Sequence, residues 1–285
     1  AGSCFFYAWG APEFFFAVFV SLILDFYLVH LFSNSKGNLR KRLFLAAILS
    51  NVLMLLLAKY LNFFVGNINE LLHIFGGKTF SWQNILLPIG VSFITFQKLS
   101  YVIDCYREKV KPLNRLRDYM VYILLFPQLI AGPIVRFNEV ASQLINRSSQ
   151  DNIDYKVSGF FRFIIGLSKK VLIANVLGGV VDEIFAVPAY ELNTGMAWLG
   201  IVAYSLQIYF DFSGYSDMAI GMAKMMGFRF PENFNAPYIS QSISEFWRRW
   251  HITLSNWMRD YLYIPIGGNR VKSKVRLYFN LWVVF

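Results

Sequence analysis

Long apolar runs interrupted by single charges are the feature that most constrains how this chain can fold. Residues 14–32 contain one acidic side chain, Asp25, and residues 43–65 contain one basic side chain, Lys59. A helix of about 20 residues is long enough to cross the hydrocarbon core of a bilayer, which is about 30 Å thick. Three further runs of similar character cover residues 85–103, 159–187 and 196–226. These runs predict an all-α, multi-pass integral membrane bundle.

The composition supports the same fold class. Apolar residues make up 56% of the 285 residues and charged residues make up 15%. A soluble domain averages about 45–50% apolar and about 25% charged residues, so the composition argues against a water-soluble globule. Aromatic residues reach 18%, which suits side chains that anchor helices at both membrane interfaces. We interpret residues 1–285 as one partial membrane domain, and the apolar ends indicate a fragment cut at both termini.

Two segments differ from simple spans. Residues 119–135 are apolar, but Pro127, Gly132 and Pro133 interrupt them, so we expect a re-entrant or interfacial segment that is covered by protein. Residues 245–263 predict an amphipathic helix that lies in the interface, because their apolar side chains recur at helical spacing. The apolar face of this helix would carry Phe246, Trp250, Leu254, Trp257 and Tyr261.

The positive charges indicate the orientation of the chain in the membrane. The formal net charge is +10, and all of the 27 lysines and arginines except Lys59, Lys78 and Lys98 fall into four segments, 36–42, 107–117, 136–170 and 224–276. Alternating spans place these segments on one side, which identifies that side as cytoplasmic. The charge is therefore explained by membrane orientation, and we expect membrane lipid rather than nucleic acid as a partner. His and Cys residues do not stand at metal-ligand spacing, so no metal site is predicted.

Two carboxylates lie close together inside the apolar run 196–226. Asp211 and Asp217 flank Ser213 and Tyr215, and Ser213 with the glycine that follows it would allow a local break in the helix. Acidic side chains at membrane depth are costly, so they mark either a functional site or a polar anchor between helices. Both interpretations stay open on the sequence alone.

His251 lies in the predicted amphipathic helix, at the edge of its apolar face. A neutral imidazole in a site of low dielectric can accept the proton of a hydroxyl group that attacks an acyl group. A histidine at such an edge can equally be a packing residue, and its spacing leaves both interpretations open. His30 and His73 have no polar partners in the sequence, and we interpret them as structural.

The stretch 247–265, WRRWHITLSNWMRDYLYIP, resembles the signature of the membrane-bound O-acyltransferase family. Three shorter motifs resemble the alginate O-acetyltransferase-like branch of that family. They are GVSFITFQ at 90–97, FPQLIAGPI at 126–134 and DFSGYSD at 211–217. Their order and spacing agree with the family over nearly the whole chain. The long tryptophan-rich motif is specific, whereas each short motif alone would be weak.

The resemblance implies a ring of tilted helices around a thin centre, with a tunnel that joins the cytoplasm to the outside. It implies an enzyme of the bacterial inner membrane that takes acetyl groups from a cytoplasmic thioester donor, expected to be acetyl-CoA. The final acceptor would be an exported polysaccharide such as alginate. A separate extracytoplasmic acetyltransferase of the SGNH type would complete the transfer, and no tightly bound cofactor is expected.

His251 matches the first of two histidines in the family pattern. The second, regarded as catalytic in the family, lies on a later helix, and the sequence ends at Phe285 before it. The resemblance thus implies that His251 belongs to the catalytic site, where it lines the tunnel or assists the base, and that this chain alone is inactive. The substrate-binding candidates are Asp211, Ser213, Tyr215, Asp217, Trp247, Arg248 and Trp250.

Two other functions compete with acetyl transfer. The D-alanyl transfer protein of teichoic acid modification shares the scaffold but takes its acyl group from a carrier protein. A transporter or channel is the second alternative, because charged side chains within apolar segments could line an ion path. These side chains are Asp25, Lys59, Lys98, Asp211 and Asp217. Against transport, the segments show no inverted repeat.

Overall fold

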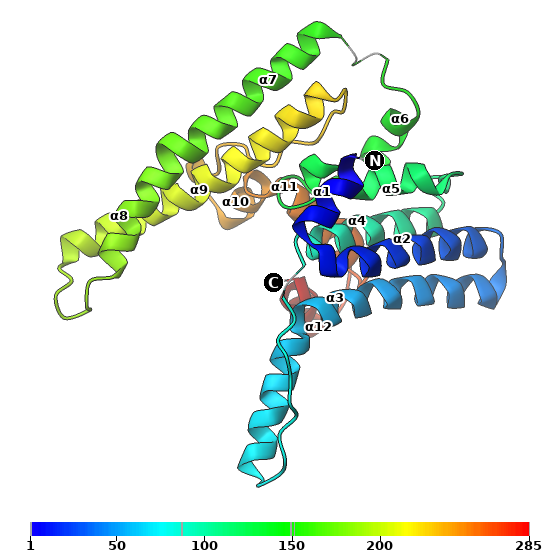
Figure 1. Ribbon diagram of the computed structural model, residues 1–285, viewed down its shortest axis with the longest axis horizontal. Coiled ribbons are helices and arrows are strands. Elements are labelled where there is room, and N and C mark those ends of the chain that lie inside the picture. Colours follow the sequence, from blue (N-terminus) through cyan, green and yellow to red (C-terminus); the bar gives the residue numbers. More distant parts are fainter. Residues whose placement is uncertain (1, 87, 149, 151, 285) are drawn as a thin grey trace. The chain divides into compact units, whose positions relative to one another are not determined.

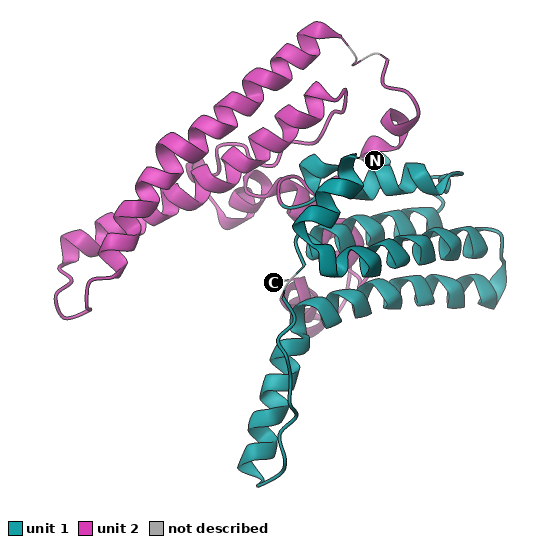
Figure 2. Cartoon of the chain, viewed as in Figure 1, with its two compact units in different colours: residues 1–130, 136–138 teal, residues 131–135, 139–285 magenta. Residues whose placement is uncertain are grey.

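The computed structural model describes residues 2–86, 88–148, 150 and 152–284. These residues form helices and loops without a strand (Figure 1), so the prediction of an all-α fold is confirmed. The chain divides into two compact units, residues 1–130 with 136–138 and residues 131–135 with 139–285 (Figure 2). That the two act together as one membrane domain stays a prediction.

In the first unit, helices α2 and α3 form a hairpin and α4 packs against both of them (Figure 1). The side chains of Leu22, Ile94 and Tyr101 are fully buried in this unit. Its elements are α1 (Gly2–Gly10), α2 (Pro12–Ser33), α3 (Gly37–Ile74), α4 (Val91–Tyr106), α5 (Leu116–Leu124) and the short 3-10 helix η1 (Phe126–Gln128).

Local backbone chemistry sets several boundaries in this unit. The helix predicted over 85–103 begins only at Val91, because Gly90 caps it with a positive φ of 71°. A β-carbon on Gly90 would clash with the carbonyl oxygen of Leu129. Both the positive φ and this close contact therefore require glycine at the position. The break predicted within 119–135 is confirmed, since only η1 is helical between α5 and Phe137.

The second unit is built on one long helix, α9 (Thr194–Met225), which packs along α7 and α8. The helix α6 (Phe137–Ile145) begins in the first unit and continues into the second. The other elements are α7 (Ile153–Ser168), the π-helix η2 (Lys169–Ala174), α8 (Asn175–Phe185), the 3-10 helix η3 (Pro237–Ile239), α10 (Ile243–Arg249), α11 (Ile252–Trp257), the π-helix η4 (Met258–Tyr263) and α12 (Lys274–Val284).

Helices α7 and α9 meet backbone to backbone at four glycines. A β-carbon on Gly166 would lie 2.5 Å from the carbonyl oxygen of Gly214, and one on Gly221 would lie 2.6 Å from that of Gly159. On each helix the two glycines are about two turns apart, so both contacts fall on one face. Small residues let membrane helices approach this closely, and the crossing therefore fixes α9 against α7.

Gly166→Ala is expected to lower the free energy of unfolding of the protein in detergent by about 1–3 kcal/mol, because the methyl group must push the two helices apart. The matched control is Gly179→Ala on α8, where a β-carbon would meet no atom within 4 Å. Helix propensity makes that control neutral or slightly stabilising. Unfolding by a denaturing detergent measures both variants, and equal stability of the two would contradict the close approach.

Within the part of the chain that the structure describes, three helical segments are long and apolar enough to cross a membrane: Pro12–Ser33, Gly37–Ile74 and Ile153–Phe185. The third joins α7, η2 and α8 without interruption. Large apolar side chains on these helices, such as Phe16 and Leu172, are exposed, as expected for surfaces that lipid solvates. The protein is therefore a membrane protein by composition and by helix length. The helix α9, which the sequence also suggested as a span, is not among the three.

The continuous amphipathic helix predicted over 245–263 is wrong. The helix α10 ends at Arg249, α11 begins at Ile252, and His251 between them has a left-handed backbone with a φ of 42°. The apolar side chains before and after this break therefore do not share one helical face. The local break that Ser213 and the following glycine would allow does not occur, because α9 passes through that position without interruption.

Candidate functional site

The chain turns sharply at His251, where φ is 42° and ψ is 53°. A left-handed backbone costs roughly 1–3 kcal/mol for a residue that carries a β-carbon, so surrounding bonds must hold it. The N–H of Ile252 donates to the backbone oxygen of Asn233 at 3.0 Å, and the N–H of Trp250 donates to that of Phe246 at 2.8 Å. The loop between α9 and α10 therefore fixes the break and receives the imidazole.

Asn233 lies at the centre of a buried hydrogen-bond network around this break, with none of its surface exposed. Its Oδ1 lies 3.0 Å from Nδ1 of His251 and accepts a bond from Oγ1 of Thr253 at 2.9 Å. Its Nδ2 lies 3.0 Å from Oγ of Ser216 and 3.4 Å from the carbonyl oxygen of Gly132. One amide thus joins α9, residues 131–135 before α6 (the broken segment) and the start of α11.

Aromatic rings surround the break. The ring of Phe212 meets the imidazole of His251 edge to face, with 4.8 Å between ring centroids. Trp250 lies edge to face with Phe234 at 5.1 Å and stacks on Phe246 at 5.6 Å. Each such pair contributes about 0.5–1.5 kcal/mol beyond the area it buries. Trp250, a predicted substrate-binding residue, is therefore part of this aromatic cluster.

Burial lowers the pKa of His251 from 6.5 to about 4, because desolvation disfavours the imidazolium. The acidic groups of the neighbouring elements are paired elsewhere: Glu245 contacts Arg249 at 2.9 Å, and Asp217 contacts Lys169 at 2.6 Å. The imidazole is therefore neutral at pH 7. A neutral imidazole keeps one bare ring nitrogen, and this is the state that can accept a proton.

The acidic candidates on α9 bind cations of the neighbouring helical segment. Asp217 is buried, and its two oxygens accept bonds from Nε of Arg162 at 2.7 Å and from Nζ of Lys169 at 2.6 Å. Asp211 pairs with Lys170. These contacts match the polar-anchor interpretation of both carboxylates. Their role in substrate binding stays a prediction.

Ser213 and Tyr215, the other two substrate-binding candidates on α9, are uncharged and form no ion pair. Ser213 is buried, and its Oγ has no hydrogen-bond partner among the described residues. Tyr215 is partly buried and lies beside Gly132 of the broken segment, where a β-carbon on the glycine would come within 3.9 Å of the ring. His251 itself contacts α9 through the ring of Phe212 and, by way of Asn233, reaches Ser216.

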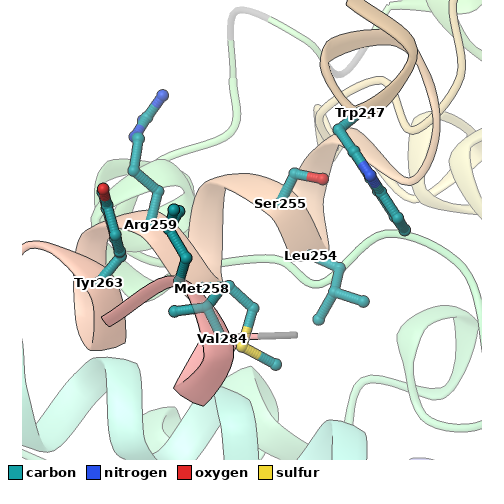
Figure 3. Close-up of a pocket in the computed structure, with 8 residues that line it drawn as sticks. Trp247, Leu254, Ser255, Met258, Arg259, Tyr263 and Val284 are labelled. Atoms are coloured by element: carbon teal, nitrogen blue, oxygen red, sulfur yellow. The ribbon is translucent and has the colours of Figure 1, made fainter. Parts of the chain in front are cut away.

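A cavity of about 490 Å³ lies beside α11 and η4 (Figure 3). Figure 3 shows Trp247 and Leu254 at one end, Tyr263 at the other and Met258 between them. The residues that line it are Trp247, Leu254, Ser255, Met258, Arg259, Tyr263, Leu281 and Val284. Trp247 is thus the predicted substrate-binding residue of α10 that reaches this cavity, whereas Arg248 is exposed on the surface of the helix.

The sequence did not reveal Asn233, which contacts His251, or Ser216 and Thr253, which bind Asn233. Asn233 lies in a loop rich in proline and asparagine, where an asparagine ordinarily serves the turn itself. The available signal was its position before the tryptophan-rich motif, but a loop has no period that marks a buried side chain. Within the described ranges, no group of three His, Cys, Asp or Glu side chains is placed to hold a metal ion.

Comparison with known proteins identifies close relatives. The chain is 46% identical to a probable alginate O-acetylase of Pseudomonas aeruginosa over 98% of its own length and 53% of the relative. It is 37% identical to a peptidoglycan O-acetyltransferase of Helicobacter pylori over 99% of its length and 58% of the relative. A teichoic acid D-alanyltransferase of Bacillus subtilis is 31% identical over 67% of the chain and 49% of the relative.

The chain spans about half the length of the curated relatives it matches. The family model for membrane-bound O-acyltransferases matches residues 4–285, which include the four motifs noted in the sequence. The resemblance inferred from those motifs is therefore confirmed. This chain belongs to the membrane-bound O-acyltransferase family.

Proposed function

We propose that the protein moves acetyl groups from a cytoplasmic thioester donor, acetyl-CoA, across the bacterial inner membrane for the O-acetylation of an exported polysaccharide such as alginate. Family membership supports an acyl donor and a membrane location. The similarity to a probable alginate O-acetylase over nearly the whole chain supports acetyl as the group and a polysaccharide as the acceptor. The observation that carries the proposal is the neutral imidazole of His251, held at a strained break by a buried network.

The chemistry needs a proton acceptor. The oxygen of a hydroxyl group attacks the carbonyl carbon of the thioester, a C–O bond forms, and the C–S bond breaks. The proton of the hydroxyl passes to the base and ends on the thiolate that leaves as a thiol. An imidazole that is neutral at pH 7 suits the first transfer, although a pKa near 4 makes His251 a weak base by itself. His251 therefore lines the site and assists a stronger base.

The charge distribution supports a donor on the cytoplasmic side. Most of the 27 lysines and arginines fall into the four segments that the orientation rule places in the cytoplasm. A basic rim of this kind raises the local concentration of a donor that carries phosphate groups. We infer that an SGNH-type acetyltransferase on the opposite side delivers the acetyl group to the polysaccharide.

D-alanyl transfer is the second candidate, because a teichoic acid D-alanyltransferase is also related to this chain. That relative matches a smaller share of the chain at lower identity than the alginate O-acetylase does. The two functions differ in the donor, which is a free coenzyme thioester in one and a D-alanyl thioester on a carrier protein in the other.

The test uses the protein expressed from its whole gene and placed in liposomes that contain an SGNH-type partner and alginate. Radiolabelled acetyl-CoA is added to the basic, cytoplasmic side, and label on the enclosed polysaccharide is measured. We expect label from acetyl-CoA, none from a D-alanyl carrier protein, and none when residues 1–285 replace the whole protein. Transfer from the carrier alone would contradict the proposal, and ion flux without acyl transfer would favour a channel.

A further inference from the structure

Asn233 has a buried side chain whose four hydrogen-bond neighbours come from three separate parts of the chain. Buried amides are normally satisfied by such bonds, so burial alone gives Asn233 no role beyond packing. What distinguishes it is that one of the four neighbours is the imidazole of His251. The bond between them decides which nitrogen of that ring carries the proton.

The neighbours of Asn233 fix the orientation of its amide. The backbone N–H of Ile134 donates to Oγ1 of Thr253 at 2.9 Å, and the Thr253 hydroxyl donates to Oδ1 of Asn233 at 2.9 Å. The backbone N–H of Thr253 also points to Oδ1, at 3.4 Å. On the other side, the carbonyl oxygen of Gly132 can only accept, and it faces Nδ2. A flipped amide would place its Nδ2 against the N–H of Thr253 and its Oδ1 against the carbonyl oxygen of Gly132.

With Oδ1 turned toward His251, Nδ1 of the ring must be the donor across the 3.0 Å contact. We propose that Asn233 is a positioning residue that holds His251 as the Nδ1–H tautomer and so presents the lone pair of Nε2 to the acyl-transfer step. The proposal rests on the proposed function for its use in acyl transfer. The tautomer itself follows from the geometry around Asn233.

Among the described residues, the acidic side chains of the surrounding elements are paired with cations, and Glu232, next to Asn233 in its loop, pairs with Arg162 at 2.6 Å. From α9, Asp211 pairs with Lys170, and Asp217 pairs with Lys169 and Arg162. From α10, Glu245 pairs with Arg249, whose guanidinium also donates to the backbone oxygen of Asn235. The broken segment 131–135 and α11 contain no charged side chain. A neutral amide is thus the polar group that meets Nδ1, and a carboxylate placed there would change the titration of His251.

The test reads the two ring nitrogens of His251 directly. Nitrogen NMR of the whole protein with labelled histidine separates a nitrogen that carries hydrogen from a bare one, and His251→Asn identifies the signals. We expect Nδ1–H in the wild type and in Asn233→Asp, which keeps an acceptor oxygen. In Asn233→Ala we expect loss of the Nδ1–H preference. Asn235→Ala, an exposed asparagine two residues away, is the matched control and should leave the ring signals unchanged.

Asn233→Asp adds a second readout. A carboxylate about 3 Å from Nδ1 favours the imidazolium, so the pKa of His251 should rise. In the pH–rate profile of acyl transfer, the fall in rate on the acid side should therefore move to higher pH. Asn233→Ala should lower transfer at least about ten-fold, a loss comparable to that caused by removing the hydrogen-bond partner of a metal-bound imidazole. A residue that only packs would change the amount of folded protein without moving the tautomer or the fall in rate on the acid side.

The outcomes separate the two proposals. A wild-type ring with Nε2–H, or an unchanged Nδ1–H in Asn233→Ala, overturns the role of Asn233 whatever the activity. If Asn233→Ala does not accumulate as folded protein, Asn233→Asp decides, since an unshifted titration of His251 in that variant overturns the role. Expected ring signals in a wild-type protein that transfers no acyl group would instead overturn the proposed function and leave the tautomer intact.

Discussion

His251→Ala is expected to lower acetyl transfer by the whole protein at least about a hundred-fold, with the amount of protein in the membrane close to wild type. General acid–base groups contribute about 10²–10⁴-fold to a rate, and this variant removes the imidazole whose bare nitrogen the network around Asn233 presents. Acetate content of the polysaccharide in cells, and label transfer in liposomes, measure the effect.

Two variants show whether the imidazole or the backbone is responsible. Asparagine tolerates a left-handed backbone better than most residues, so His251→Asn keeps the break between α10 and α11 but removes the imidazole that assists the base. It should be as inactive as His251→Ala. His73→Ala, on the exposed surface of α3, should retain full activity. Normal acetate content in His251→Ala at normal protein level would exclude His251 from the mechanism.

The pH dependence of the wild type follows from the same group. The pKa of His251 in the folded protein is about 4, whereas the ordinary value is 6.5. Between these values the unfolded chain binds the proton and the folded site does not, so folding stability falls as the pH drops through this window. Transfer that depends on the neutral imidazole should likewise persist to below pH 6.5 and fail near pH 4.

The long helices could be predicted from the sequence because their signal is local. A run of apolar residues with the length of a membrane span predicts α2, α3 and the segment Ile153–Phe185 regardless of what packs against them. The break at His251 could not be predicted in this way, because the side-chain period continues through it. It depends on bonds to Asn233, which lies eighteen residues earlier in the chain.

The candidate site was predictable only in part for the same reason. The motif at 247–265 led to His251, but the partners of each polar residue come from distant segments. Asp217 looked like an isolated charge at membrane depth, yet its partners Arg162 and Lys169 lie 55 and 48 residues before it. Periodicity and motif spacing give no information about such pairs, so they could not separate an anchor from a substrate-binding residue.

A second large effect is expected in the first unit, where Lys98→Met should lower the free energy of unfolding by about 3–5 kcal/mol. Nζ of Lys98 lies 3.2 Å from Oδ2 of Asp25, and each side chain is only 1% exposed. Removing the cation leaves the carboxylate of Asp25 buried without a counter-ion, although Asn51 still donates to it. Lys59→Met removes an exposed charge of α3 and should change stability little.

The double variant Asp25→Asn with Lys98→Met separates a counter-ion from an ion path. Suppose that each charge serves only as the counter-ion of the other. Removing both charges should then restore most of the lost stability, because the attraction within a buried ion pair roughly offsets the cost of taking both ions out of water. Any acetyl transfer that Lys98→Met loses through unfolding should be restored together with the stability. Unfolding in denaturing detergent and label transfer in liposomes measure the two effects. A double variant that is as stable as wild type but inactive would show that the charges themselves take part in function, as the channel alternative requires.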